Sequence, residues 1–142
     1  MNRVDCNYFN IEKTGRMGVH MSSIKLYGLN ACDTCRKARK LLDALKVDYT
    51  FTDLREEAAR HNGQLSSSLV QHFFDQAPWE TLINKRSTTW RQLSDEEKAS
   101  LTSQKSAVAL AIQHPTLLKR PLLDDGKSLV VGLDEQAYKA LV

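Results

Sequence analysis

The sequence lacks any long hydrophobic run. No stretch of its 142 residues approaches the ~20 consecutive apolar residues that a membrane-spanning helix needs. Residues 1–20 also lack the apolar centre of a secretion signal, because charged side chains interrupt them. These charges belong to Asp5, Glu12, Lys13 and Arg16. We therefore expect a cytoplasmic protein with no membrane partner.

Charge of one sign is not concentrated anywhere in the chain. The 20 Lys and Arg residues exceed the 17 Asp and Glu residues by only three, and the two signs are interspersed. Without a dense basic block, the composition does not favour a nucleic-acid partner, although small anions are compatible ligands. A chain of 142 residues, 42% of them hydrophobic, is long enough for one domain with a substantial core.

Cysteine is scarce, with three residues in the chain. Because the cytoplasm keeps thiols reduced, three cysteines do not indicate a disulfide scaffold. A structural zinc site needs four ligands, and outside the pair Cys32 and Cys35 only Cys6 and four scattered histidines remain, so we expect no metal. We interpret Cys6 as an incidental exposed thiol. The C-x-x-C spacing of Cys32 and Cys35 is the most informative pattern in the sequence.

Hydrophobic periodicity places this C-x-x-C pair where a strand gives way to a helix. Residues 24–27 alternate between apolar and polar and precede Gly28, which predicts a short strand. Apolar residues then recur at helical spacing from Cys35 to Leu45. Residues 48–52 are rich in aromatic and β-branched side chains, which predicts a second strand. Strand, helix and strand over this length form a βαβ unit.

The middle of the chain is predicted to be mainly helical. Residues 53–63 are polar and are interpreted as a loop, whereas residues 65–73 have helical spacing. Ser94 followed by Glu97 has the pattern of a capping box, which predicts another helix start. Residues 107–111 indicate a further helix that ends before a proline.

The C-terminal part is predicted to form a hairpin and one helix. Asp125 and Gly126 lie between the apolar runs 121–123 and 129–131, a pattern typical of a β-hairpin. Asp134 then predicts the N-cap of a last helix.

No repeat, low-complexity tract or linker divides this periodic region. We assign residues 23–142 to one domain of the α/β class. Residues 1–22 show no periodicity. We interpret them as a poorly ordered N-terminal extension, or as a segment upstream of a true start at Met21.

The position of Cys32 predicts a reactive thiol. Backbone N–H groups at a helix start lack internal partners and carry partial positive charge, so they stabilise a thiolate and lower its pKa. Arg36 adds positive charge one turn later, whereas Asp33 acts in the opposite direction, which predicts a moderate effect. Cys35 lies on the apolar helix face and should be more sheltered. An exposed attacking thiol beside a sheltered resolving thiol suits a two-cysteine cycle; the alternative is that Cys35 is a small core residue.

Four segments resemble the ArsC family: Leu26–Gly28, Cys32–Arg39, Arg86–Leu93 and His114–Pro121. That family contains glutaredoxin-linked arsenate reductases, the Spx transcription regulators and a YffB branch, and this chain most resembles the YffB branch. The resemblance extends from residue 24 to about residue 142. It implies a thioredoxin-like fold, with a βαβ–ββα core, a four-stranded mixed sheet and an inserted helical segment.

The resemblance also implies roles for single residues. In the arsenate reductases one cysteine attacks the oxyanion and three arginines hold it. The cysteine corresponds to Cys32, and one arginine corresponds to Arg120, which precedes Pro121 across an expected cis bond. The other two arginines fall on Asn84 and Gly132, which argues against arsenate as the substrate. The expected catalytic residues are Cys32, Cys35 and Arg120.

The expected substrate contacts are residues that supply positive charge or border the thiol: Arg36, Arg86, Arg91 and Pro121. For each of these arginines the alternative is a solvated surface charge. The implied activity is that of a thiol–disulfide oxidoreductase, which takes electrons from glutathione or glutaredoxin and passes them to a small molecule or a disulfide. Glutathione is then a co-substrate, and we expect no tightly bound cofactor.

A binding protein is the alternative to an enzyme. The Spx regulators carry a similar C-x-x-C motif, so the pair Cys32 and Cys35 also fits a redox switch on an RNA polymerase contact. Two departures argue against this alternative. Those regulators have a glycine where this chain has Pro78, and they continue with a charged tail beyond the last helix. We therefore favour the reductase.

Overall fold

Four strands form one mixed sheet. The computed structural model describes residues 24–142, so the prediction for residues 1–22 and that for Cys6 fall outside the described residues. The strands are β1 (Lys25–Gly28), β2 (Thr50–Asp53), β3 (Leu122–Asp124) and β4 (Leu129–Val131). Their order in the sheet is β2–β1–β3–β4. β1 runs parallel to β2 and antiparallel to β3, and β4 runs antiparallel to β3.

The predicted βαβ unit is confirmed. Helix α1 (Asp33–Ala44) connects β1 to β2, which begins two residues later than predicted. Its apolar residues Cys35, Ala38 and Leu42 are all fully buried. Spacing of three and four residues puts these side chains on one face of the helix, which is the face that covers the sheet.

The predicted hairpin and final helix are also confirmed. β3 and β4 are joined by a turn in which Asp125 accepts two backbone N–H groups, and Gly126 in that turn has a φ of +92°. Helix α8 (Glu135–Lys139) begins after Asp134, whose Oδ1 accepts the Ala137 N–H at 3.1 Å. The side chain of Asp134 therefore satisfies one of the free donors at the helix start.

A helical insert separates β2 from β3 in the sequence. It consists of α2 (Leu54–Ala59), α3 (Ser67–Gln76), α4 (Trp79–Leu82), α5 (Thr88–Gln92), α6 (Asp95–Ser100), α7 (Gln104–Gln113) and the 3-10 helix η1 (Pro115–Leu117). The capping box is confirmed, because Ser94 and Glu97 each accept the other's N–H at 3.0 Å. Helices α4, α5 and η1 were not predicted. No helix within residues 24–142 combines the length and apolarity that crossing a membrane requires.

The interpretation of residues 53–63 as a loop was wrong, because they include helix α2. Asp53 is its N-cap and accepts the N–H groups of Arg55 and Glu56. Leu54 and Ala58 are buried one turn apart. Two apolar positions are too few for a periodic pattern, so the helix is specified by its cap and by tertiary packing.

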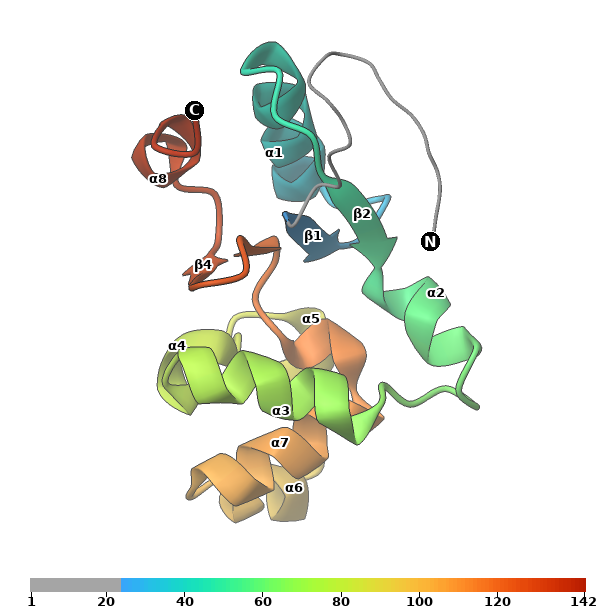
Figure 1. The fold of residues 1–142 in the computed structure, drawn as a ribbon. Coiled ribbons are helices and arrows are strands. Elements are labelled where there is room, and N and C mark those ends of the chain that lie inside the picture. The colour runs from blue at the N-terminus through green and yellow to red at the C-terminus, as the bar shows by residue number, and fades with distance from the viewer. Residues whose placement is uncertain (1–23) are drawn as a thin grey trace, which may run out of the picture.

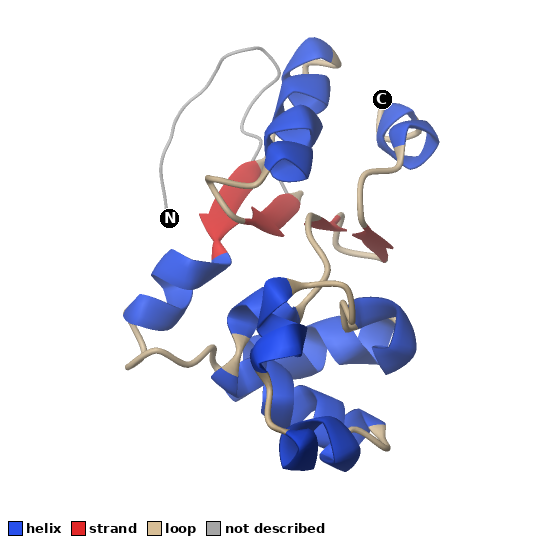
Figure 2. Ribbon diagram, turned by 180° about the vertical axis from the view of Figure 1, so that it is seen from behind, coloured by secondary structure: helices blue, strands red, loops and turns tan. Residues whose placement is uncertain are grey.

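Strand alternation divides the apolar residues between the two faces of the sheet. Leu26 packs with α1 and with the fully buried Tyr138 of α8. Its neighbour Tyr27 points to the other face and meets Phe73 of the insert edge-to-face, with ring centroids 4.9 Å apart. In Figure 1, α1 and α8 lie above the sheet and α3 to α7 lie below it. Figure 2 shows the same three layers from behind, with the red strands in the middle.

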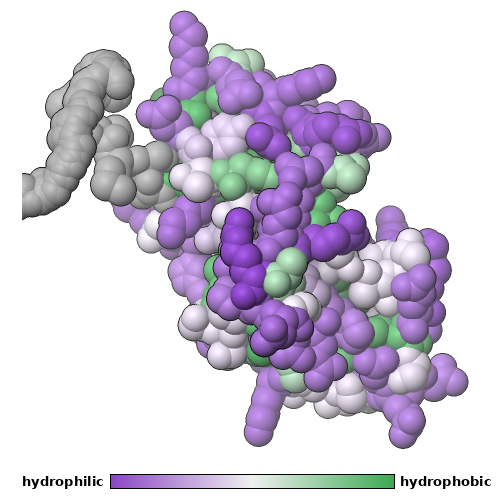
Figure 3. Space-filling view, turned by 90° about the vertical axis from the view of Figure 1, so that its right-hand side faces the viewer, coloured by the Kyte–Doolittle hydropathy of each residue, from purple (hydrophilic) through white to green (hydrophobic). Residues whose placement is uncertain are grey.

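The surface is predominantly polar. In Figure 3, hydrophilic side chains cover most of the face that is shown, and hydrophobic ones form small separate areas. Within residues 24–142, Val142 is the one large hydrophobic residue that is exposed. The described apolar residues are therefore used mainly to fill the two layers beside the sheet.

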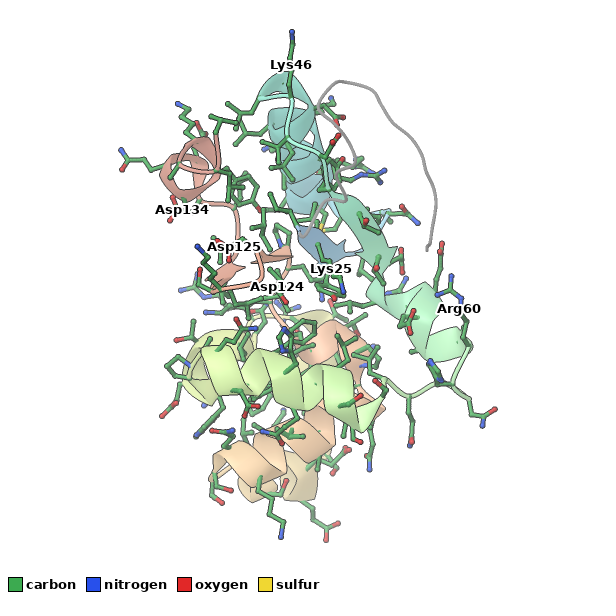
Figure 4. The ribbon with its side chains drawn as sticks, viewed as in Figure 1. Lys25, Lys46, Arg60, Asp124, Asp125 and Asp134 are labelled. Carbon is green, nitrogen blue, oxygen red and sulfur yellow. The ribbon has the colours of Figure 1, made fainter. Side chains whose placement is uncertain are left out.

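A buried acid fastens the insert to the sheet. Asp124, at the end of β3, is only 6% exposed. Its Oδ2 lies 2.5 Å from His72 Nε2 on α3, and its Oδ1 accepts the Gly126 N–H at 2.9 Å. Lys25 is its register partner on β1, and Figure 4 shows the two side chains at the level of the sheet.

We expect Asp124→Ala to lower the free energy of unfolding by about 2–3 kcal/mol, because hydrogen bonds to charged groups contribute about 1.5–3 kcal/mol each. Urea denaturation of the full chain measures this loss. Asp75→Ala on α3 is the matched control: Asp75 is exposed and bonds only Gln71 among the described residues, so a change within about 0.5 kcal/mol is expected. Equal losses in both variants would contradict the anchoring role of Asp124.

Candidate functional site

Cys32 lies on a tight turn between β1 and α1. The Cys32 N–H donates to the Leu29 carbonyl at 3.2 Å, and the Arg36 N–H donates to the Cys32 carbonyl at 3.0 Å. Cys32 is the N-cap residue of α1 and has an extended backbone, with φ −85° and ψ 123°. The predicted position of this thiol, beside the free N–H groups of the first helical turn, is therefore confirmed.

The Cys32 thiol is half-buried. Its burial acts to raise its pKa, but several groups that stabilise the thiolate outweigh that effect and hold the pKa below its usual value. In decreasing order they are the backbone N–H of Cys35, the Cys35 thiol, the backbone N–H of Thr34 and the Arg120 side chain. A thiolate at this position is thus supported by the helix start from one side and by a guanidinium from another.

The Cys35 thiol differs from Cys32 in both burial and pKa. It is fully buried, and this burial raises its pKa to about 11, with Cys32 acting in the same direction and the Leu29 N–H and Arg120 against it. The two thiols of the C-x-x-C motif therefore differ in both exposure and acidity. The predicted contrast between an accessible Cys32 and a sheltered Cys35 is confirmed.

The sulfur of Cys35 lies directly against the backbone of Gly28. A Cβ atom at Gly28 would sit 2.4 Å from Cys35 Sγ and 3.3 Å from Cys35 Cβ. In the sequence, Gly28 marked the end of a strand and belonged to a segment that resembles the ArsC family. Its lack of a side chain is what allows α1 to approach β1 with a cysteine in between.

We expect Gly28→Ala to destabilise the protein by about 1–3 kcal/mol, the usual cost of overpacking a core. The penalty should shrink markedly in a Cys35→Ala background, because the sulfur that the new methyl group meets is then absent. A double-mutant cycle measured by urea denaturation gives this coupling. If the effects of the two substitutions are additive, the contact with Cys35 Sγ is not the reason that alanine destabilises position 28.

Arg120 is held over the site by backbone carbonyls. Its Nη1 donates to the Thr116 carbonyl at 2.7 Å and to the Leu118 carbonyl at 3.1 Å. Its Nε is buried without a hydrogen-bond partner among the described residues. The peptide bond to the fully buried Pro121 is cis, as expected. The two carbonyls thus fix the orientation of the guanidinium, and the Arg120 side chain helps to lower the pKa of Cys32.

We expect Arg120→Ala to raise the pKa of Cys32 by about one unit, because an adjacent positive charge favours the thiolate. The rate of iodoacetamide labelling at Cys32, followed against pH by mass spectrometry, measures the shift. Arg91→Ala, which removes an exposed guanidinium from α5, is the matched control and should leave the profile unchanged. An unchanged profile in Arg120→Ala would contradict this role.

The other predicted substrate contacts do not converge on the thiol in the same way. Arg36 is half-exposed and pairs with Asp33 on the outer face of α1, so its charge is offset. Arg86 and Arg91 are both exposed, and Arg91 Nη2 donates to the Arg86 carbonyl at 3.2 Å. Pro121 is buried next to Arg120. The structure therefore brings Cys32, Cys35 and Arg120 together, and Pro121 follows Arg120 in the chain.

The two positions matched to arginines in the arsenate reductases offer no cation. Asn84 Oδ1 accepts the Arg86 N–H at 3.0 Å, so this side chain caps a turn. Gly132 has a φ of +84°, and its N–H donates to the Pro121 carbonyl at 2.8 Å. A Cβ there would meet nothing within 4 Å, which leaves open space beside the Arg120–Pro121 step.

Tyr138 is a neighbour of the site that the sequence did not indicate. Its hydroxyl is buried and lacks a hydrogen-bond partner among the described residues. Burial raises the pKa of Tyr138, with Cys35 and Asp134 adding to the effect. Nothing in the local pattern of α8 marks this tyrosine, because its relation to Cys35 arises only when the helix packs on α1. In the same part of the chain, residues 24–142, no group of three or more His, Cys, Asp and Glu side chains could hold a metal ion.

Comparison with protein families and sequences gives a consistent result. The model of the ArsC family matches residues 27–141. An uncharacterized protein of Haemophilus influenzae is 37% identical over 118 residues, which are 82% of this chain and 96% of that protein. The global transcriptional regulator Spx 2 of Bacillus anthracis is 30% identical over 117 residues, which are 82% of this chain and 84% of the regulator.

Solved structures share the fold. A YffB protein is 34% identical, with a TM-score of 0.73 and coverage of 82% of this chain and 96% of that one. An arsenate reductase (ArsC) related protein from Brucella melitensis is 33% identical, with a TM-score of 0.65 and coverage of 89% and 97%. The expected α/β, thioredoxin-like fold with a four-stranded mixed sheet is confirmed.

Proposed function

Because the chain belongs to the ArsC family, we propose that it is a thiol-dependent reductase in which Cys32 attacks the substrate and Cys35 resolves the intermediate. The observation that carries the proposal is the contrast between the two thiols. Cys32 is accessible and its pKa is lowered, whereas Cys35 is fully buried and its pKa is raised to about 11. An attacking thiol must be ionised and reachable, and a resolving thiol must be close and protected from outside reagents.

The cycle begins at the Cys32 thiolate. It attacks one sulfur of a substrate disulfide, so that a bond forms between Cys32 and that sulfur while the other sulfur leaves as a thiolate and takes up a proton. Arg120 orients an anionic substrate and stabilises the thiolate through its charge. The product of this step is a mixed disulfide on Cys32.

Resolution then requires Cys35. After losing its proton, the Cys35 sulfur attacks the Cys32 sulfur, the substrate thiolate departs, and an internal disulfide joins the two cysteines. Two molecules of glutathione, or one glutaredoxin dithiol, supply the two electrons that return both cysteines to thiols. Cytoplasmic glutathione is the abundant reductant in such a cycle, so we place the protein in that compartment, without a tightly bound cofactor.

The similarity to Spx 2 favours a second candidate function. In this alternative the same disulfide between Cys32 and Cys35 switches a contact with RNA polymerase, and no substrate is turned over. The chemistry of the two thiols is identical in both cases. What differs is the partner.

Two assays on the full chain separate these functions. The reductase predicts steady turnover of a small disulfide with glutathione and glutathione reductase supplied, and no capture of the polymerase α subunit. The regulator predicts capture of the α subunit that changes on oxidation, with turnover no faster than that of Cys32→Ser. The second result would overturn the proposed reductase.

A further inference from the structure

A single carboxylate ties the turn that carries Cys32 to the end of β2. Asp53 Oδ2 accepts the Asn30 N–H at 2.8 Å. Its other oxygen, Oδ1, accepts the N–H of Arg55 at 2.8 Å and the N–H of Glu56 at 3.0 Å. Asp53 therefore caps α2 with one oxygen and holds the turn before α1 with the other.

The side chain of Asn30 strengthens the same connection. Its Nδ2 donates to Glu56 Oε2 at 3.0 Å, and its Oδ1 lies 3.4 Å from Arg39 Nη1. The Arg39 guanidinium in turn lies 4.2 Å from the centroid of the Phe51 ring. Residues of β2, α1 and α2 thus meet at one residue of the turn.

This turn decides where the Cys32 thiol lies. The Cys32 N–H donates to the Leu29 carbonyl, so Asn30 is the first central residue of the turn that presents Cys32. Asp53 is also the register partner of Gly28, the residue at the end of β1. A shift of Asn30 would therefore move Cys32 relative to the N–H groups of the first turn of α1.

The Asp53 carboxyl is suited to hold this position at neutral pH. Burial acts to raise its pKa, but the N–H groups of Asn30, Glu56 and Arg55 outweigh burial and hold the pKa below its usual value. The charge of Arg55 on α2 also lowers the pKa of Asp53, and two further charged groups, Glu56 on α2 and Arg39 on α1, contact the Asn30 side chain. The lowered pKa favours the ionised carboxylate, the form that accepts all three N–H groups.

We infer that Asp53 is a positioning residue for Cys32, which acts by fixing the Asn30 N–H and with it the turn. The inference rests on the proposed role of Cys32 as the attacking thiol. Asp53 need not contact the substrate.

The direction of one measurable change tests this inference. A carboxylate that acted on Cys32 only through its negative charge would raise the thiol pKa, so its removal would lower that pKa. A carboxylate that acts by positioning has the opposite effect, because its removal loosens the thiol from the N–H groups that stabilise the thiolate.

Asp53→Asn is the most informative variant. Asn is a good N-cap residue, and its one remaining oxygen should keep the two N–H groups of α2 and leave Asn30 facing an amide donor. Asp134→Asn is the matched control, because it makes the same change at the N-cap of another short helix, α8. Figure 4 labels Asp134 at α8, which lies on the opposite side of the view from α2. Iodoacetamide labelling of each cysteine against pH, in the full chain, gives the apparent pKa.

We expect Asp53→Asn to raise the apparent pKa of Cys32 by about half a unit to one unit, which slows labelling at neutral pH by about three- to tenfold. Asp134→Asn should leave the Cys32 profile unchanged. An unchanged or lowered pKa in Asp53→Asn, with Cys32 still the faster thiol in the wild type, would overturn the positioning role alone. If Cys35 labels faster than Cys32 in the wild type, the proposed function and this inference both fail.

A second variant keeps the test valid if Asp53→Asn does not fold. Asp53→Ser keeps a good N-cap side chain for α2 but has no second oxygen to accept the Asn30 N–H. We expect it to slow Cys32 labelling about three- to tenfold, as Asp53→Asn does. A labelling rate equal to that of the wild type would overturn the inference.

Discussion

Cys32→Ser is expected to abolish the reaction of this protein with oxidised glutathione, whereas Cys35→Ser is expected to stop the reaction after its first step. A serine hydroxyl is not ionised at neutral pH and cannot form a disulfide. Without Cys35, the mixed disulfide on Cys32 has no internal attacker and should accumulate. Intact-mass spectrometry after incubation with oxidised glutathione distinguishes one bound glutathione on Cys35→Ser from none on Cys32→Ser.

The same experiment needs the third thiol removed. Carrying Cys6→Ser in every variant leaves Cys32 and Cys35 as the only reactive groups, and peptide mapping locates the adduct. In the otherwise wild-type protein the adduct should give way to an internal disulfide, two mass units below the reduced form. A glutathione adduct on Cys35 in the Cys32→Ser variant would show that the two roles are reversed.

Turnover of arsenate should be slower than in a dedicated arsenate reductase by roughly two to four powers of ten. Two of the three arginines that the resemblance assigns to oxyanion binding are replaced by Asn84, which caps a turn, and by Gly132, which has no side chain. Hydrogen bonds to charged groups contribute about 1.5–3 kcal/mol each, and 1.4 kcal/mol corresponds to a factor of ten. Arg120 alone, with Nη1 engaged by carbonyls, does not replace that loss.

Steady-state arsenate reduction with glutathione and glutaredoxin supplied measures this prediction. Asn84→Arg is an informative gain-of-function control, because it restores a cation at one of the matched positions. It should increase arsenate turnover if the site is otherwise complete. Turnover by the wild type at the level of a dedicated enzyme would contradict the prediction and show that other groups complete the anion site.

Sequence reasoning succeeded where one short segment carries its own signal. The spacing from Cys35 to Leu45 placed α1, and Asp125–Gly126 placed the hairpin. It failed at α2, where the N-cap Asp53 is followed by only two buried positions. The second oxygen of Asp53 accepts the Asn30 N–H, a contact across 23 residues that no local pattern indicates. A segment specified by contacts from elsewhere in the chain carries little signal of its own.

The residues of the candidate site also divide into those with a local sequence signal and those placed by distant contacts. Cys32 and Cys35 were identified by their spacing and by their place before a helix, and the structure agrees on their exposure. Arg120 was identified only through resemblance, because its approach to Cys32 depends on β3 pairing with β1, which is far from it in the sequence. The relation of Gly28 and of Tyr138 to Cys35 gave no signal, since it arises only from tertiary packing.

The contact between Gly28 and Cys35 also limits how far the Cys35 sulfur can be oxidised. Sulfinic and sulfonic acids add two and three oxygen atoms to a cysteine sulfur, and both are largely irreversible. Cys35 Sγ is fully buried against the backbone of β1, so these oxygens would have to displace the strand or the helix. Peroxide damage should therefore accumulate on Cys32, and a sulfenic acid formed there has a spared thiol beside it that can return it to a reducible disulfide.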